Sequence, residues 1–133
     1  MRAYTTSHDE IISTLEETGD YRVLRRLKTP TQYHQLNGTK TKLAVLLDLE
    51  TTGLDPEKDE IIEIAIVPFT YSNDGRIFKV YEAYNELQEP SEAIPAVITQ
   101  ITGITNEMVL GHKISAEKVL EAVEPAALII AHN

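Results

Sequence analysis

The 133-residue sequence contains no cysteine and no apolar stretch long enough to span a lipid bilayer. The absence of cysteine excludes disulfides and thiolate metal sites, and it agrees with a reducing compartment. The longest apolar runs, such as residues 126–131, fall far short of the roughly 20 residues that a membrane-spanning helix needs. Because the first ten residues carry no apolar stretch behind their positive charge, we expect a cytoplasmic protein without a membrane partner.

Positive charge is scarce and unevenly distributed. The chain has 12 lysine and arginine residues against 21 aspartate and glutamate residues, which gives a net charge of -9. Residues 1–42 contain seven bases and five acids, a balance of +2, so residues 43–133 carry -11. Proteins that bind nucleic acid normally contact phosphate through lysine and arginine. If the acidic part binds a polyanion, we expect divalent cations to mediate the contact, because they reverse the sign of the local field.

Residues 1–42 read as a helical extension and linker ahead of one small domain at residues 43–133. Ser7 and Glu10 have the spacing of a capping box, which predicts a first helix. The pattern at residues 21–27 predicts a second short helix that docks through an apolar side and presents Arg22, Arg25 and Arg26 on the other side. This basic side is either a phosphate contact or an ordinary solvated surface, and the second interpretation is preferred.

The rest of the chain alternates between strand and helix patterns. Three aliphatic runs predict β-strands joined by tight antiparallel turns, at residues 43–50, 61–69 and 76–84. The first of them suits a central strand that is buried on both faces. Helical patterns follow, from Pro95 at a first helical position to Gly103 and again after Ser115, and residues 128–130 read as another strand. This order predicts an α/β fold with a mixed sheet and packed helices.

Asp48 and Glu50 interrupt the first aliphatic run, next to a tight turn at residues 51–53. Side chains two positions apart on a strand share a face, with Cα atoms roughly 6.6 Å apart. Two carboxylates on a largely apolar strand repel each other and lose hydration unless a positive group compensates. No lysine or arginine is near them in the sequence. The pair therefore predicts a site for a hard divalent cation, Mg²⁺ or Mn²⁺, whose preferred ligands are oxygens.

Three segments together carry a family resemblance. They read Asp-Leu-Glu-Thr-Thr-Gly-Leu at residues 48–54 with Asp-Glu-Ile-Ile-Glu-Ile-Ala at 59–65, Ile-Thr-Gly-Ile-Thr at 101–105, and Leu-Ile-Ile-Ala-His-Asn at 128–133. The first resembles the first exonuclease motif of the DEDD-type 3′-to-5′ exonuclease family, which includes the proofreading epsilon subunits of bacterial DNA polymerase III. The other two match that family in type and order. The resemblance covers residues 43–133, the front half of the usual catalytic domain.

The resemblance implies a ribonuclease H-like fold in which four carboxylates hold two Mg²⁺ or Mn²⁺ ions and hydrolyse the 3′ ends of single-stranded nucleic acid, DNA being favoured. Asp48 would bridge both ions, and Glu50 would hold one. A DNA polymerase subunit is a further implied partner. Thr102 stands where the family often has histidine, so an aromatic stacking surface is lost. Substrate binding would fall to Thr51, Thr52, Gly53, Leu54, Thr102, Gly103, Ile104, His132 and Asn133.

In the family, the second motif continues past the residues that match His132 and Asn133 to an aspartate, and a third motif adds a base and a last aspartate. This sequence contains neither. We therefore expect a truncated fold that is catalytically inactive alone and that folds marginally or self-associates. His132 is not interpreted as the general base, because in the family this histidine helps to order the site. An RNA-trimming nuclease of the ribonuclease T or oligoribonuclease type, and a non-catalytic nucleic-acid-binding or partner-binding module, stay open as alternatives.

The remaining polar residues carry weaker signals. Glu63 has two interpretations of equal weight, a buried hydrogen-bonding role beside the site and a plain exposed position. The acidic turn at residues 55–59 lacks the ligand spacing of a calcium loop, which indicates a solvated turn. Without ligand spacing between them, three histidines are interpreted as surface residues: His8, His34 and His112.

Overall fold

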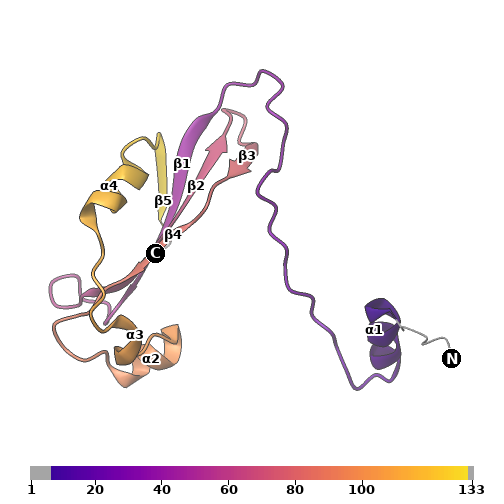
Figure 1. Cartoon of the computed structure of the whole chain (residues 1–133), viewed down its shortest axis with the longest axis horizontal. Helices are drawn as coiled ribbons and strands as arrows, with labels where there is room; N and C mark the ends of the chain where they lie inside the picture. Colours follow the sequence, from indigo (N-terminus) through magenta and orange to yellow (C-terminus); the bar gives the residue numbers. More distant parts are fainter. Residues whose placement is uncertain (1–6, 132–133) are drawn as a thin grey trace.

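The computed structural model describes residues 7–131, which contain one mixed β-sheet (Figure 1). Its strands are β1 (Lys42–Thr51), β2 (Ile61–Tyr71), β3 (Ile77–Val80), β4 (Tyr84–Leu87) and β5 (Leu128–Ala131). Their order is β3-β2-β1-β5, and β4 also pairs with β2. β1 is antiparallel to β2 and parallel to β5. The predicted α/β class and the mixed sheet are therefore confirmed.

The predicted third strand at residues 76–84 is wrong, because two short strands occupy this region. β3 pairs with residues 69–71 of β2, and β4 pairs with residues 63–66 farther along the same edge. Pro68 lies between these two ladders and has no N–H group to donate to a neighbouring strand. Its carbonyl accepts a hydrogen bond from the Tyr81 N–H at 2.9 Å, so this edge of β2 faces the chain that joins β3 to β4. The missing donor explains why the pairing is interrupted there.

The described helices are α1 (His8–Glu17), α2 (Ala96–Thr102), α3 (Asn106–Val109) and α4 (Ala116–Val123). The predicted capping box is present at α1, and Ser115 accepts a hydrogen bond from the Lys118 N–H at the start of α4. Gly103 ends α2 with a φ of 78°, a left-handed conformation that favours glycine. Pro95 precedes α2 as its N-cap and is not its first helical residue. No helix within residues 7–131 is long and apolar enough to cross a membrane.

The core lies between the sheet and the helices that follow it. Residues of α4 and its flanks pack on one face of the sheet against Val45, Ile64 and Ile66. At the start of β2, a second group of buried side chains joins this strand to α3 and to the loops beside α2: Ile62, Ile94, Ile104 and Val109. These two groups hold the β1–β2 hairpin in place relative to α2, α3 and α4.

The expectation that β1 is buried on both faces is wrong. The sheet face opposite α4 carries no helix in the described part of the chain (Figure 1). Leu46 lies on this face and is 46% exposed, and its neighbour on β5, Ile130, is 40% exposed. Alternation along the strand explains the difference, because Val45 and Leu47 pack toward α4 whereas Leu46 points the other way.

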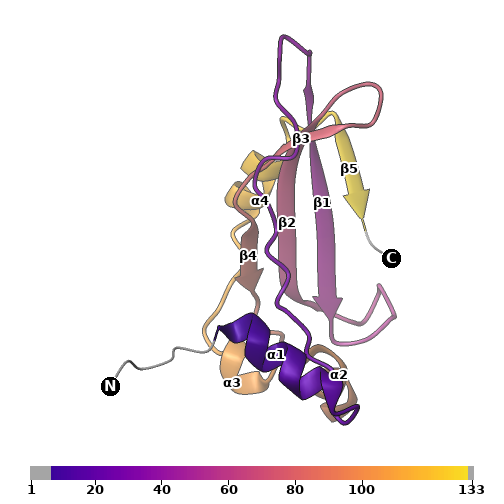
Figure 2. The ribbon, with the colours of Figure 1, turned by 90° about the vertical axis from the view of Figure 1, so that its right-hand side faces the viewer.

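The N-terminal extension also differs from expectation. Residues 21–30 form no helix, and α1 stands away from the sheet, so the predicted second helix and the predicted docking are both wrong (Figures 1 and 2). Leu24 and Leu27 are 82% and 85% exposed. A short helix needs an apolar face that is buried against other elements, and here nothing in the described chain covers that face. The extension contacts the domain farther on, where Thr31 and Tyr33 bond to β3.

Candidate functional site

Asp48 and Glu50 lie close to the C-terminal end of β1. They are opposite Ala65 and Glu63 of β2, and the strand is regular between them, because the β-bulge follows Glu50. Both therefore point to the face opposite α4. Asp48 is exposed and Glu50 is half-buried. The structure thus brings the two carboxylates onto one face at the end of the strand, beside the turn that follows β1.

Glu63 adds a third carboxylate to this face. It is the cross-strand partner of Glu50, it is half-buried, and its Oε1 accepts a hydrogen bond from Asn85 Nδ2 at 3.0 Å. The structure falls between the two interpretations of Glu63, because the residue is only half-buried and its hydrogen bond to Asn85 is exposed. Within residues 7–131, no group of three or more histidine, cysteine, aspartate or glutamate side chains is arranged to hold a metal ion.

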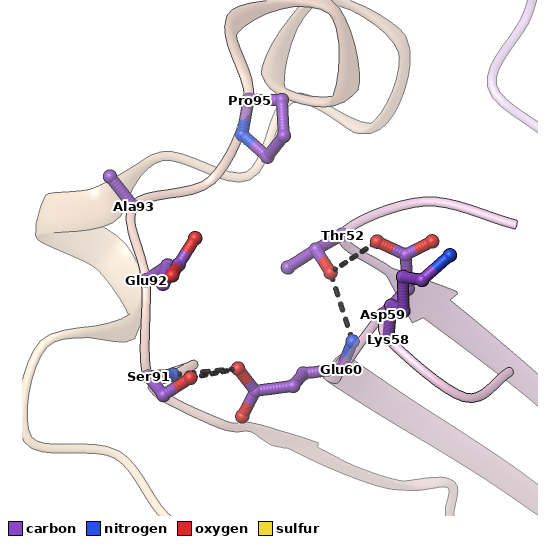
Figure 3. Close-up of a pocket in the computed structure, with 8 residues that line it drawn as sticks. All are labelled: Thr52, Lys58, Asp59, Glu60, Ser91, Glu92, Ala93 and Pro95. Carbon is purple, nitrogen blue, oxygen red and sulfur yellow. Dashed lines mark hydrogen bonds between the residues drawn. The ribbon is translucent and has the colours of Figure 1, made fainter. Parts of the chain in front are cut away.

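The loop after β1 is held by a network centred on Thr52 and Asp59 (Figure 3). The Thr52 hydroxyl donates to Asp59 Oδ1 at 3.1 Å and accepts from the Glu60 N–H at 2.9 Å. The Thr52 N–H donates to the Glu60 carbonyl at 2.9 Å. Asp59 Oδ2 accepts from the Asp55 N–H at 2.8 Å, which closes the loop on itself. The hydrogen bonds of Thr52 therefore fix the conformation of the loop that carries the predicted nucleotide contacts.

Gly53 is required in this loop because of a close approach. A Cβ atom added there would lie 2.4 Å from Asp59 Oδ2, well inside contact distance. The neighbouring Thr51 hydroxyl donates to the Gly53 carbonyl and tightens the turn. Leu54 follows with a fully exposed side chain. The loop therefore presents an apolar side chain to solvent from a backbone that is fixed by internal hydrogen bonds.

Residues 102–104, which were predicted to contact the terminal nucleotide, lie at the C-terminal end of α2. The Thr102 hydroxyl donates to the Ile98 carbonyl at 2.9 Å and accepts from the Ile104 N–H at 3.1 Å. Gly103 adopts the left-handed conformation described above. Ile104 is only 4% exposed and packs in the core beside Ile62, so its side chain supports this segment from within. His132 and Asn133 lie outside the described residues, and their predicted roles stay predictions.

A polar cavity of about 310 Å³ lies between the β1–β2 loop and the segment before α2 (Figure 3). The Glu60 carboxylate crosses it to accept hydrogen bonds from the Ser91 N–H, at 2.9 Å, and from the Ser91 hydroxyl. Its lining includes the acidic residues Asp59, Glu60 and Glu92 and a single cation, Lys58. This surplus of carboxylates repels phosphate. Asp48 and Glu50 do not line the cavity, and nothing in the local sequence pattern predicted that Glu60 and Ser91 would meet.

The strongest effects on pKa lie away from these residues, between β4 and α4. Lys118, Tyr84 and the Ser115 N–H lower the pKa of Glu86 to about 2, and the Lys118 Nζ to Glu86 Oε1 distance is 2.8 Å. Burial and then Glu86 raise the pKa of Tyr84 to about 12. This group ties α4 to the sheet.

The histidines predicted to be at the surface are exposed, although the His34 ring also lies 5.7 Å from that of Phe78.

The sequence is similar to known exonucleases. The sequence model of the family described as "Exonuclease", of the ribonuclease T type, matches residues 45–133. A DNA polymerase III of the PolC type from Thermotoga petrophila is 46% identical over 92 residues, which are 67% of this chain and 6% of that protein. The 3′-5′ exonuclease DinG of Bacillus subtilis is 39% identical over 93 residues, 67% of this chain and 9% of that protein. The chain therefore spans less than a tenth of the length of these relatives.

Two further comparisons concern a shorter relative and the fold. The DNA polymerase III subunit epsilon of Aquifex aeolicus is 39% identical over 80 residues, 60% of this chain and 37% of that protein. Exonuclease I of E. coli, solved with a dT13 oligonucleotide, superposes with a TM-score of 0.54 over 69% of this chain and 20% of that chain, at 17% identity. At this identity the superposition supports the fold alone, and it agrees with the ribonuclease H-like fold implied by the sequence.

Proposed function

Because this chain belongs to the exonuclease family, of the DEDD type with a ribonuclease H-like fold, we propose that it acts as a 3′-to-5′ exonuclease domain on single-stranded DNA. One observation carries the proposal. Asp48 and Glu50 share one face at the end of β1, inside the part of the chain that the family matches. Both carboxylates are beside the internally bonded loop of residues 51–59.

The donor set fits a hard divalent cation. Asp48 and Glu50 are carboxylates that share one face of β1, and carboxylate oxygens are the ligands that such an ion prefers. Mg²⁺ or Mn²⁺ held there would polarise the scissile phosphate and lower the pKa of a bound water. We propose that Asp48 and Glu50 provide two of the four carboxylates that the family uses.

The residues of this chain then act by positioning. Thr52 and Asp59 hold the loop that follows the carboxylates, and the exposed Leu54 side chain offers an apolar surface for the terminal base. Thr102 and Gly103 shape the end of α2 and supply a polar edge. Ile104 supports them from the core. We propose that these elements bind the terminal nucleotide, together with His132 and Asn133.

The proposed substrate is DNA, and the proposed setting is proofreading or repair in the cytoplasm. Among the relatives are DNA polymerases III of the PolC type and an epsilon subunit, which supports association with a polymerase subunit. The chain covers only a small part of those proteins, so the substrate, the partner and the location are part of the proposal.

We further propose that the 133-residue chain is inactive alone. Asp48 and Glu50 are two carboxylates, whereas the family resemblance implies four together with a general base. Loss of a general base typically costs 10² to 10⁴-fold in rate. Full activity is expected only when the chain is extended through the residues of the second and third motifs.

The test compares the 133-residue chain with a version extended through those motifs. Each is incubated with 5′-labelled single-stranded DNA or RNA in Mg²⁺ or Mn²⁺, and Asp48→Ala versions report any contaminating nuclease. The extended form should trim DNA from the 3′ end, and Asp48→Ala should abolish trimming. An extended form that trims neither substrate refutes the exonuclease proposal, and trimming of RNA alone refutes the choice of DNA. Activity of the short chain that is lost with Asp48→Ala refutes the proposed inactivity.

A further inference from the structure

The basic residues of this chain are concentrated in one acid-free stretch. No aspartate or glutamate occurs between Asp20 and Asp48, yet this stretch holds six of the 12 lysine and arginine residues of the whole chain. The domain that follows is strongly acidic. Opposite charges are therefore separated along the chain, and a phosphate backbone that reaches the Asp48 face meets few cations on the domain itself.

Within that stretch, residues 21–30 form an extended segment that we call the basic arm. Four of its residues are basic: Arg22, Arg25, Arg26 and Lys28. All four are exposed, and only Arg25 forms an ion pair among the described residues, with Asp9. The predicted helix is absent, and no acid lies within the arm itself, although Asp20 and the acidic residues of α1 precede it. Its large apolar side chains, such as Leu24 and Leu27, are uncovered as well.

Hydrogen bonds join the arm to β3 at its C-terminal end and to α1 at its N-terminal end. At its C-terminal end, the Val80 N–H donates to the Thr31 carbonyl at 2.9 Å, and the Tyr33 N–H donates to the Phe78 carbonyl at 2.8 Å. These bonds add the chain to the free edge of β3. At its N-terminal end, the Val23 N–H donates to Glu16 Oε1 at 3.2 Å, which joins the arm to α1.

The arm lies on the same side of the sheet as the carboxylates. Figures 1 and 2 place it opposite α4, and Asp48 and Glu50 also face away from α4. From β3, the arm runs toward the level at which β1 ends (Figure 2), and it moves away from the sheet along the way (Figure 1). An extended chain spans at most about 3.5 Å per residue, so the cations from Arg22 to Lys28 are spread over up to roughly 20 Å, a length that covers several phosphates.

We propose that the basic arm binds the phosphate backbone of the single-stranded nucleic acid whose 3′ end is received at Asp48 and Glu50. This inference rests on the proposed exonuclease function and gives it a substrate-binding element outside the catalytic sheet. The arm recognises phosphate and reads no base. It supplies the positive charge that the acidic domain lacks.

The test measures binding of a fluorescein-labelled oligothymidylate to the 133-residue chain by anisotropy, in EDTA and at several salt concentrations. The arm variant is Arg22→Gln with Arg26→Gln, two exposed residues outside any described ion pair. The control variant, Lys40→Gln with Lys113→Gln, removes the same charge from two exposed residues that lie outside the arm and outside any described ion pair. Circular dichroism confirms that both variants stay folded.

The arm variant should bind at least several-fold more weakly, and the slope of log affinity against log salt should fall by about 1.4, from two phosphate contacts at about 0.7 each. The control variant should keep the original slope. The proposal is overturned if both variants lose the same amount of affinity for the oligothymidylate, or if neither loses any. It is also overturned if the arm variant changes self-association in sedimentation but still binds DNA normally, because the arm then binds the acidic domain of a second copy.

Failure of this inference and failure of the proposed function can be told apart. EDTA removes divalent ions, so Asp48→Ala should leave the measured binding unchanged. If the chain binds the oligonucleotide through the arm but its extended form trims no nucleic acid, the arm inference stands and the exonuclease proposal is rejected. If the extended form trims nucleic acid but the arm variant binds as tightly as the original chain, the exonuclease proposal stands and the arm inference is rejected.

Discussion

Replacing Gly53 with alanine should destabilise the chain by displacing the Asp59 carboxylate. The new Cβ would lie 2.4 Å from Asp59 Oδ2, so one of the two groups has to move. The carboxylate can swing away only by losing its bonds from the Thr52 hydroxyl and the Asp55 N–H, at 3.1 and 2.8 Å. Hydrogen bonds to a charged group contribute about 1.5–3 kcal/mol each when buried, and this site is half-exposed, so the expected total is about 1–3 kcal/mol.

A double-mutant cycle makes the expectation sharp. Asp59→Ala removes the same two hydrogen bonds and should cost the same amount, about 1–3 kcal/mol. In the Asp59→Ala background the added methyl group of Gly53→Ala meets no carboxylate, so its cost should fall close to zero. The double variant should therefore be about as stable as Asp59→Ala alone, and the two changes should be strongly non-additive.

The assay is urea unfolding of the four proteins of the cycle, followed by circular dichroism. Gly53→Ala combined with Asp74→Ala is the matched control, because Asp74 lies in the turn between β2 and β3, at the other end of β2, and bonds Ser72 and Arg76. Those two changes should add. If Gly53→Ala and Asp59→Ala also add, the close approach does not explain the glycine, and the loop is not held in the way described.

Three further outcomes are expected. The pKa of Glu86 is lowered from 4.5 to about 2, so the contribution of its carboxylate to stability is complete above pH 4.5 and is lost as the pH falls toward 2. The urea midpoint of Glu86→Gln should therefore change less with pH in that range than the midpoint of the original chain. In calorimetry, Mn²⁺ should bind weakly to the chain and Asp48→Asn should abolish the signal, whereas loss of the signal with Asp55→Asn instead would move the site to the acidic turn. Ile104→Ala should cost about 2–4 kcal/mol in urea unfolding, because it opens a cavity in the core; a cost below about 1 kcal/mol would contradict the burial of this side chain.

Local patterns of the sequence determined several features that the structure confirms. The capping box starts α1, Ser115 starts α4 and Gly103 ends α2, because these signals act through hydrogen bonds and dihedral preferences within a few residues. The period of two along β1 was enough to predict that Asp48 and Glu50 point to one face. The order of strands and helices was enough to predict the mixed sheet.

Only the tertiary structure decided the features that depend on distant partners. Residues 21–27 carry an apolar stripe at helical spacing, yet they stay extended, because a helix of this length needs a surface to bury against and none is adjacent. Pro68 divides the third predicted strand, although it lies on a different strand. Asp59 lies close to Gly53, and Glu60 accepts a hydrogen bond from Ser91. Local periodicity in the sequence predicts neither of these contacts. The sequence alone identified the two carboxylates that are proposed to bind a cation. The fold decided which face, loop and arm surround them, because those contacts are made between segments far apart in the chain.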